Sequence, residues 1–518
     1  MSQTQLRGKT VAARGTVPSP SPGGKGLAAG QLGLLAVVVI GISTIAPAYV
    51  LTSTLGPTVQ AIGAHLPAIF VVGFIPMFMV ALGYRELNAD SPDSGTTFTW
   101  VTKAFGPVVG WMGGWGLLAA NIIVLSNLAG VAVDFFYLFV SQLTGQGWIA
   151  GLAANKPVNV LTCLVFVAAA VWVSSRGVKT TKSVQYLLVA FQLGVLAWFV
   201  IGAFSKVAAG QAATSMAFSW SWFNPLDIGS FSAFAAGLSL SIFSFWGWDL
   251  CLTMSEETTN SKKTSGLAAA IVAIAVLVIY VVGSIAVVMF AGVGNTGVGL
   301  TNPDIAENVF TAIASPVMGP FAILLSLAVL SSCGASLQST FVSPARSLLA
   351  MGYYKALPSR FASVNPRFQS PVFATVAAGV VSAGFYALMR YLSDNVLNDT
   401  IQALGLMICF YYGITALACV WYFRHSLFKS VRNFFFRLVF PLLGGVGLVV
   451  VFLQTAADSW DPSFGSGSQL FGVGLVFVIG VGILVLGAVV MAVVHWRMPG
   501  FFRGETLKQD TPALVVPE

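Results

Sequence analysis

The chain has 518 residues, of which 57% are hydrophobic and 8% charged, with 54 glycines and a mean hydropathy of +0.86. Soluble domains carry about 25% charged residues, so this composition excludes a water-soluble enzyme. Its apolar content also excludes a disordered chain. The net charge of +8 would allow a nucleic-acid partner, and the positions of the basic residues decide whether one is needed.

Residues 1–32 are polar, rich in Pro, Gly and Ser, and contain Arg7, Lys9, Arg14 and Lys25. They lack the short apolar stretch of a secretory signal, so we interpret them as a disordered basic tail. The five cysteines are scattered inside apolar runs, which is typical of packing residues and not of a disulfide framework or a metal site.

A bilayer core of about 30 Å requires about 20 apolar residues in a helix. By this criterion the chain contains twelve predicted membrane spans joined by short connections. They lie near residues 33–59, 66–88, 108–140, 157–174, 183–205, 229–255, 266–292, 318–350, 371–392, 400–423, 436–455 and 469–494.

The basic residues divide unequally between the two sides of the membrane. All Lys and Arg fall in the two tails and the even-numbered loops, except Lys156, Lys206 and Arg390. Because positive charge stays in the cytoplasm, we predict a multi-pass protein of the cell membrane with both termini cytoplasmic. The basic charge is then a topology signal, so we expect the lipid bilayer and no nucleic acid as a partner.

Two predicted spans carry polar interruptions at mid-depth. In the first, Gly41 and Pro47 bracket Ser43 and Thr44 within a long apolar run. The sixth span reads Ser-Ile-Phe-Ser-Phe-Trp-Gly-Trp-Asp over residues 241–249. Irregular backbone survives at membrane depth only where protein or a water-filled cavity satisfies it, and paired interruptions indicate a transport site. Glycines that merely pack helices are the alternative.

The two interrupted spans lie five spans apart, and an odd separation reverses the direction of the second copy. The pattern therefore predicts two inverted five-helix repeats, residues 33–205 and 229–423. Two additional helices within 436–494 and a C-terminal cytoplasmic tail, 495–518, complete the predicted organisation.

Several short motifs across residues 35–375 resemble those of the amino acid–polyamine–organocation permeases. They include Ala81-Leu82-Gly83-Tyr84-Arg85-Glu86-Leu87 with Pro92 and Gly95, Phe105-Gly106-Pro107, Gly177-Val178-Lys179, Gly247-Trp248-Asp249, Ala345-Arg346, and Asn365-Pro366-Arg367. Each motif alone is weak, but their order and spacing make the resemblance strong.

The resemblance implies an all-α, LeuT-like membrane fold whose substrate, an amino acid or related amine, lies between the breaks of spans 1 and 6. The substrate-binding set that follows is Gly41, Ser43, Thr44, Ala46, Phe243, Ser244, Phe245, Trp246 and Gly247. A half-helix starting near Ala46 would offer free N–H groups to a substrate carboxylate, and freed carbonyls would accept its ammonium.

Asp249 is the strongest single candidate for a functional residue, because placing a carboxylate near the bilayer centre costs about 2.5–3.5 kcal/mol of insertion free energy. We expect it to carry the coupling proton or to anchor an amine; a neutral structural acid is the alternative. Some proton-coupled members carry a lysine in span 5, and counting from Gly177 places Gln192 there. The coupling ion, H⁺ or Na⁺, therefore stays open.

Other polar residues have weaker predicted roles. Ser331 and Ser332 are a possible ion site, with helix packing the favoured interpretation. Arg85, Glu256, Glu257 and Arg346 are a possible inner gate, although a solvated end of span 6 fits Glu256 and Glu257 better. Asp134 is interpreted as a vestibule or structural acid.

These observations predict a secondary active transporter that works by alternating access, with proton-coupled symport as the expected mode. An exchanger is the alternative within this class, and a channel for small organic cations is the alternative from another class. No filter-like segment, hydrolase motif or phosphate-binding loop is visible, so we expect neither an enzyme nor a cofactor.

Overall fold

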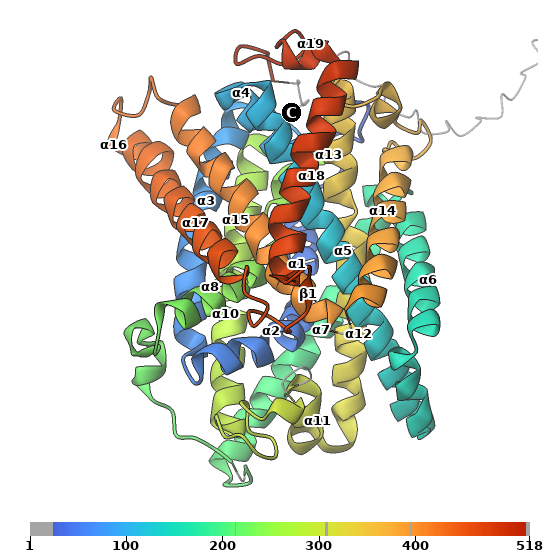
Figure 1. Cartoon of the computed structure of the whole chain (residues 1–518), viewed down its shortest axis with the longest axis vertical. Coiled ribbons are helices and arrows are strands. Elements are labelled where there is room, and N and C mark those ends of the chain that lie inside the picture. Colours follow the sequence, from blue (N-terminus) through green and yellow to red (C-terminus); the bar gives the residue numbers. More distant parts are fainter. Residues whose placement is uncertain (1–23, 213, 306–308, 394, 514–518) are drawn as a thin grey trace, which may run out of the picture.

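The computed structural model describes residues 24–212, 214–305, 309–393 and 395–513. Over these ranges the chain is a bundle of helices that run mostly along one axis (Figure 1). The sheet structure of the described residues is one two-stranded hairpin, β1 (Gln469–Leu470) with β2 (Val473–Gly474). Residues 1–23 of the predicted N-terminal tail lie outside the described residues.

The twelve predicted spans all correspond to helical segments, and three of them, the first, sixth and eighth, are divided into two helices. The first five are α1 (Leu34–Ile45) with α2 (Pro47–Ile62), α3 (Leu66–Asp90), α5 (Pro107–Thr144), α6 (Lys156–Ser174) and α7 (Val178–Ala208). The next five are α8 (Phe231–Ser244) with α9 (Leu250–Thr253), α10 (Ser261–Ala291), α12 (Ala322–Thr340) with α13 (Val342–Tyr353), α14 (Val372–Leu392) and α15 (Val396–Tyr422). The last two are α17 (Phe440–Asp458) and α18 (Leu475–Arg497).

Shorter helices connect these segments. They are α4 (Thr97–Phe105), α11 (Val309–Met318), α16 (Val431–Asn433), α19 (Pro499–Phe502), a π-helical turn at Phe434–Val439, and short 3₁₀ turns such as Gly147–Ala154 and Ser255–Glu257.

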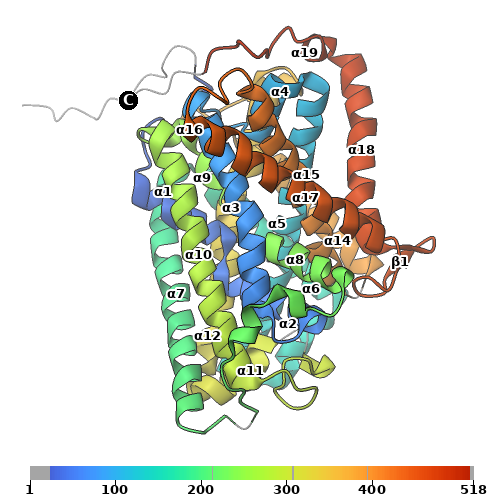
Figure 2. The same ribbon diagram turned by 90° about the vertical axis from the view of Figure 1, so that its left-hand side faces the viewer.

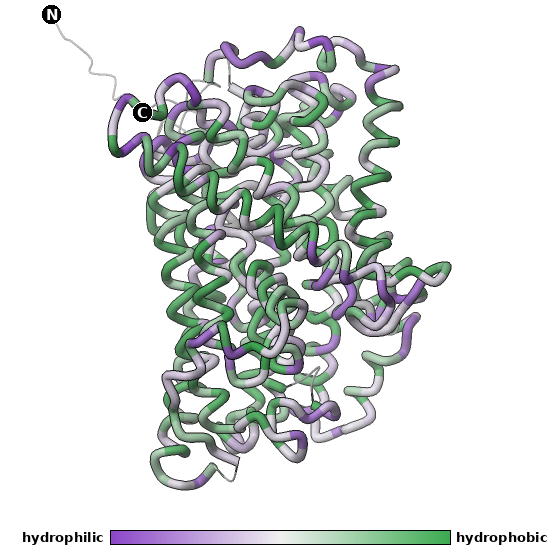
Figure 3. Tube along the Cα trace, turned by 60° about the vertical axis from the view of Figure 1, so that its left-hand side comes forward, coloured by the Kyte–Doolittle hydropathy of each residue, from purple (hydrophilic) through white to green (hydrophobic). Residues whose placement is uncertain are grey.

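Eleven helical segments within the described residues are long and apolar enough to cross a membrane. The twelfth, Phe231–Ser244, is shorter because span 6 is interrupted in the middle. Apolar side chains also point outward from the bundle: Leu35, Leu161 and Val380 are each more than 60% exposed. Hydrophobic residues dominate the long helices, and polar residues gather at the ends and along a few inner segments (Figure 3). The chain is a multi-pass membrane protein.

The first ten segments form the body of the bundle, and the last two lie at its edge. Helix α17 packs on α3 and α15, whereas α18 packs on α5 and α15. Figure 2 shows α17 crossing the body obliquely and α18 standing at one side. The predicted all-α, twelve-span fold with divided first and sixth segments is confirmed, while the exact boundaries of its units stay predictions.

The two ends of the bundle differ in structure. One end carries α4, α13 and α19 together with the first described residues, and we call it the tail face (Figures 1 and 2). At the opposite end a cavity opens between α2, α5 and α15, and we call this end the pocket face.

Candidate functional site

The first break lies between α1 and α2, at Ala46. Its backbone is left-handed (φ 57°), and Pro47 then begins α2 at the first helical position. Proline suits this position because its missing N–H would have no helical partner there. The half-helix α2 therefore starts at mid-membrane, where the sequence predicted it. Its first N–H groups lie outside the helical ladder, and that of Tyr49 donates to Ser332 Oγ at 3.4 Å.

The second break lies between α8 and α9. Helix α8 ends at Ser244, and the chain turns through Phe245 to Asp249 before the four-residue helix α9 begins. Gly247 has φ 109°, a conformation that side-chain-bearing residues rarely adopt. The turn is held by its own backbone: Trp246 N donates to Phe243 O at 2.9 Å.

The two breaks are in direct contact. A Cβ atom added to Gly247 would lie 3.1 Å from Thr44 Cγ2 and 3.5 Å from Ile45 N. The glycine therefore serves two purposes, the positive φ and the close approach to the first break. This contact is the geometric centre of the candidate site.

Gly41 lies where α1 packs against α9 and α10, and not between the two breaks. A Cβ at Gly41 would meet Cys251 Sγ at 2.7 Å and Val272 Cγ2 at 2.9 Å. This glycine thus lets α1 pack closely on α9 and α10. Among the predicted substrate-binding residues, Gly41 is the one whose surroundings are those of a helix-packing position.

The hydroxyl groups of the first break point to α7 and α12. Ser43 Oγ donates to Gln185 Oε1, and Gln185 Nε2 donates to the carbonyl of Ala335 at 2.9 Å. Gln185 is therefore a span-5 residue that contacts the first break, whereas the amide of Gln192 is buried and has no hydrogen-bond partner among the described residues. Counting from Gly177 chose a residue two turns farther along the same face of the helix.

Thr44 is held by two serines of α12. Its hydroxyl oxygen lies 2.9 Å from both Ile40 O and Ser339 Oγ, and its carbonyl accepts from Ser336 Oγ at 2.7 Å. Ser331 donates to Ala328 O in its own helix, and Ser332 accepts from the N–H of Tyr49 at the start of α2. Ser336 and Ser339 were missed by sequence reasoning, which had no means to fix the rotation of α12.

Asp249 lies beside an aromatic cluster. Its carboxylate is buried, and Tyr411 Oη lies 3.5 Å from Oδ2, while the same hydroxyl accepts from Trp246 Nε1 at 2.5 Å. Tyr412 stacks on Trp248 with 4.9 Å between the ring centroids. Within the described part of the chain no salt bridge joins Asp249 to a basic residue.

The tyrosine pair of α15 was also missed. Tyr84, which belongs to the motif after span 2, packs edge-on against both Trp248 and Tyr412. The only available signal was two adjacent tyrosines, Tyr411 and Tyr412, in an otherwise apolar span. Together these rings surround the second break and leave Asp249 in a mostly apolar environment with hydroxyl neighbours.

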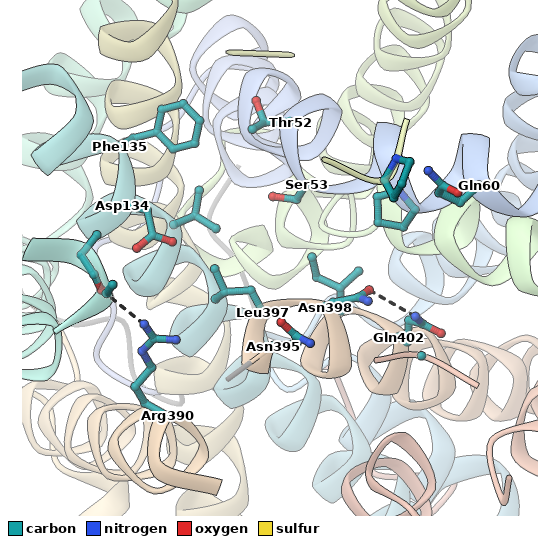
Figure 4. Close-up of a pocket in the computed structure, with 17 residues that line it drawn as sticks. Thr52, Ser53, Gln60, Asp134, Phe135, Arg390, Asn395, Leu397, Asn398 and Gln402 are labelled. Atoms are coloured by element: carbon teal, nitrogen blue, oxygen red, sulfur yellow. Dashed lines mark hydrogen bonds between the residues drawn. The ribbon is translucent and has the colours of Figure 1, made fainter. Parts of the chain in front are cut away.

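The pocket face holds a cavity of about 640 Å³ (Figure 4). Ser53 of α2, Asp134 of α5 and Asn398 of α15 line it together with Arg390 from the end of α14. Asp134 accepts from Asn159 Nδ2 at 3.4 Å. The cavity walls therefore carry side chains of both charges.

One turn closer to the breaks, the same three helices are tied together. Tyr49 of α2 donates from its hydroxyl to Asn127 Oδ1 at 2.5 Å, and Asn127 Nδ2 donates to Thr400 Oγ1 at 2.9 Å. Tyr49 and Asn127 lie one helical turn before Ser53 and Val131, which line the cavity. Tyr49 therefore lies between the cavity and the first break along α2.

At the tail face the predicted gate residues form two separate groups. Arg346 makes a bidentate pair with Glu257, Nε–Oε2 2.5 Å and Nη2–Oε1 2.8 Å, and both side chains are buried. Arg85 instead lies 3.5 Å from Glu86. Both Glu256 and Glu257 are buried, so a solvated end of span 6, the favoured interpretation from the sequence, does not describe them.

A family model for the amino acid permeases matches residues 32–453 of this chain. The chain belongs to the amino acid permease family. The low-affinity putrescine importer PlaP of Escherichia coli is 22% identical over 83% of this chain and 89% of its own length. The branched-chain amino acid permease BcaP of Bacillus subtilis is 25% identical over 68% and 73%.

A plant relative matches over a smaller part of its length. The vacuolar cationic amino acid transporter 4 of Arabidopsis thaliana is 24% identical over 72% of this chain, which spans 61% of that relative. Among solved structures, MhsT in complex with L-phenylalanine has a TM-score of 0.56 and 16% identity, covering 81% of this chain and 98% of that one. This likeness confirms the LeuT-like fold of the permease.

Proposed function

We propose that this permease is a secondary active transporter that moves an amino acid or a related amine across the cell membrane by alternating access. The observation that carries the proposal is the contact between the two breaks, where Gly247 meets Thr44. Unpaired main-chain groups at this depth need a partner, and a small zwitterion supplies both signs of charge. The transport activities named for the relatives support the same substrate class.

We assign the substrate to the space next to the breaks. The start of α2 offers N–H groups after Ala46 to a carboxylate, with the positive end of the helix dipole behind them. Phe243, Ser244, Phe245 and Trp246 supply the opposite wall, where Trp246 is fixed by its bond to Tyr411. Ser43 and Thr44 act mainly by holding the first break open against α7 and α12.

We place the tail face in the cytoplasm, because it carries nearly all of the basic residues. The pocket face is then external, and the cavity between α2, α5 and α15 is the path by which substrate enters. The described conformation is accordingly closed toward the cytoplasm.

Proton coupling is assigned to Asp249. It is the carboxylate next to the second break, and its hydroxyl neighbour Tyr411 connects it to Trp246 of the break itself. Protonation of Asp249 would therefore change the contacts of the substrate wall. Ser331 and Ser332 were a possible Na⁺ site, and Na⁺ dependence is the result that would replace H⁺ coupling.

The decisive measurement is uptake of radiolabelled amino acids and amines into proteoliposomes under imposed pH or Na⁺ gradients. A transporter shows saturable uptake and counterflow, whereas a channel cannot exchange one substrate against another. Accumulation only when a second substrate is loaded inside would identify an exchanger. Absence of saturation and of counterflow would overturn the proposal.

Asp249→Asn tests the coupling residue. We expect normal membrane expression and substrate counterflow but loss of accumulation driven by a pH gradient, since the amide cannot titrate. Asp249→Glu is the matched control and keeps most of the pH dependence. Unchanged pH-driven accumulation in the asparagine variant would show that Asp249 is structural.

A further inference from the structure

The first described residues of the chain form a non-helical segment at the tail face. Gln31 N and Leu32 N both donate to Glu257 O, at 2.8 and 3.0 Å, and Thr259 N donates to Leu32 O at 2.9 Å. Leu32 is fully buried. Residues 24–32, which we call the strap, are therefore fastened to the chain that leaves span 6.

The side chain of Lys25 in the strap is buried among acidic and aromatic residues. Its ammonium lies 2.9 Å from Asp93 Oδ2, 2.6 Å from Glu256 Oε1 and 3.3 Å from Ser94 Oγ, and its side chain has no exposed surface. The rings of Tyr353 and Tyr354 lie 5.9 and 5.6 Å from the same nitrogen. Two carboxylates, a hydroxyl and two aromatic rings thus surround one ammonium group, and we call Asp93, Glu256, Tyr353 and Tyr354 the cage.

The members of the cage come from different parts of the fold. Asp93 follows α3 in the first repeat, Glu256 ends the sixth segment, and Tyr354 follows α13. Asp93 is itself fixed by Gly95 N at 2.7 Å and by the Tyr354 hydroxyl at 2.8 Å. Lys25 therefore links elements that have to separate if the tail face is to open.

The charges of the cage require a cation. Without Lys25 two buried carboxylates would be left close together, and an uncompensated buried charge is strongly unfavourable. Lys103 is the other nearby cation, but it donates to Ser91 Oγ and Thr511 O, at 2.8 and 2.9 Å.

Lys25 and Asp93 both remain charged at neutral pH. Burial alone would lower the pKa of Lys25, but Asp93 and Glu256 outweigh it and raise this pKa above its ordinary value. Burial would likewise raise the pKa of Asp93, but Lys25 lowers it below its ordinary value. The electrostatic link is therefore complete under physiological conditions.

We propose that the cage is a binding site for a primary alkylammonium group, that Lys25 of the strap is its built-in ligand, and that Lys25 has to leave for the tail face to open. The consequence for transport rests on the alternating-access function proposed above. The binding of the strap and its effect on accessibility do not depend on that function.

A native cysteine reports on the opening. Cys251 of α9 is fully buried, and its thiol contacts Val37 O of α1 at 3.7 Å. It lies on the tail-face side of the two breaks, between the inner halves of spans 1 and 6. Its thiol becomes accessible from the tail face when these halves separate.

The experiment measures the rate at which a membrane-impermeant methanethiosulfonate labels Cys251 in inside-out vesicles. The background protein carries serine at the other four cysteines, which are Cys163, Cys333, Cys409 and Cys419. Lys25→Ala should raise the labelling rate roughly 10- to 100-fold, the range of a typical coupling between two sites. Lys262→Ala, an exposed lysine at the same face, is the matched control and should label like the background.

Chemical rescue tests the binding site itself. Added ethylammonium should return the labelling rate of Lys25→Ala toward the background, whereas tetramethylammonium, which has no N–H donor, should not. Labelling of Lys25→Ala as slow as the background would overturn the role in opening. Fast labelling that both cations leave unchanged would overturn the alkylammonium site.

A second variant covers the case in which Lys25→Ala does not fold. Lys25→Met with Glu256→Gln removes one charge of each sign, so the cage keeps its charge balance. A monodisperse double variant should still label fast, and slow labelling there would refute the proposal. The labelling assay needs no substrate. Faster labelling of the variant together with absent uptake in proteoliposomes would therefore support the role of the strap and contradict the proposed transport function.

Discussion

Both faces of this permease carry acidic and basic side chains, but these are buried in ion pairs at the tail face and line an open cavity at the pocket face. At the tail face Glu256 and Glu257 are both buried, and each is paired with a buried cation, Lys25 and Arg346 respectively. At the pocket face Asp134 and Arg390 line a cavity of about 640 Å³ instead of closing it. The comparison indicates that ion pairs hold one end of the bundle closed only where they are buried, because exposed ion pairs contribute little to stability.

The largest expected effect comes from breaking the buried pair at the closed face. Arg346→Met leaves Glu257 buried without its cation, and breaking such a pair costs about 3–5 kcal/mol. We expect a strongly lowered melting temperature, measured by size-exclusion chromatography after heating in detergent. The double variant Arg346→Met/Glu257→Leu should recover most of the loss. A single variant as stable as wild type would mean that the pair does not hold the tail face.

The next largest effect lies between the two faces, at the contact of the breaks. Gly247→Ala forces a side chain into φ 109° and brings its Cβ to 3.1 Å from Thr44. Backbone strain of this kind costs about 1–3 kcal/mol. We expect expression to persist while substrate affinity, measured by scintillation proximity binding, falls about tenfold or more.

Gly194→Ala is the matched control for that substitution. Gly194 lies in α7 with nothing within 4 Å of an added Cβ and with an ordinary φ. It should bind substrate like wild type. If both variants bind substrate with the same affinity, the contact between the breaks is not part of the substrate site.

A smaller effect is expected at the open face. Asp134→Asn removes a partly exposed charge from the cavity wall, where exposed charges are worth about 0.2–1 kcal/mol. We expect the KM of a cationic substrate to rise about 1.5- to 5-fold at low ionic strength, and the difference to disappear in high salt. Asp227→Asn, an exposed acid in the connection between α7 and α8, is the control. A loss that persists in high salt would assign Asp134 to a specific contact.

The sequence predicted the elements that depend on local chemistry. The first break was expected between Gly41 and Pro47 because proline removes a backbone donor, and the structure places it at Ala46. The second was expected from Gly247, which indeed carries the positive φ. In both cases a single residue type dictates the backbone at its own position.

The partners of the breaks could not be predicted in the same way. Gln185 and Gln192 lie seven residues apart, so they share a face of α7 and differ by about 10 Å in height. Only the packing of α7 on α1 and α12 selects Gln185. Lys25 was placed in a disordered tail because its composition is polar, whereas its burial depends on two acids far along the chain.

The smallest expected effect is that of pH on the closed face. The pKa of Asp93 is lowered, so its contribution is present above its ordinary value and is lost only as the pH falls below that value. The pKa of Lys25 is raised, so its contribution is present below its ordinary value and is lost only as the pH rises above it. Lys103, whose pKa is lowered by burial, and Tyr354 also face this group.

The labelling rate of Cys251 should therefore stay constant between about pH 5 and 9. Because the reagent reacts with the thiolate, each rate is divided by the rate measured at the same pH for the denatured protein. Uptake driven by a proton gradient should change over the same range if Asp249 carries the coupling. A labelling rate that follows the pH dependence of uptake would mean that the strap itself titrates. In that case the tail face and the transport site would both change their protonation over this range. The proposal instead requires that the tail face keeps its charges while Asp249 changes its protonation.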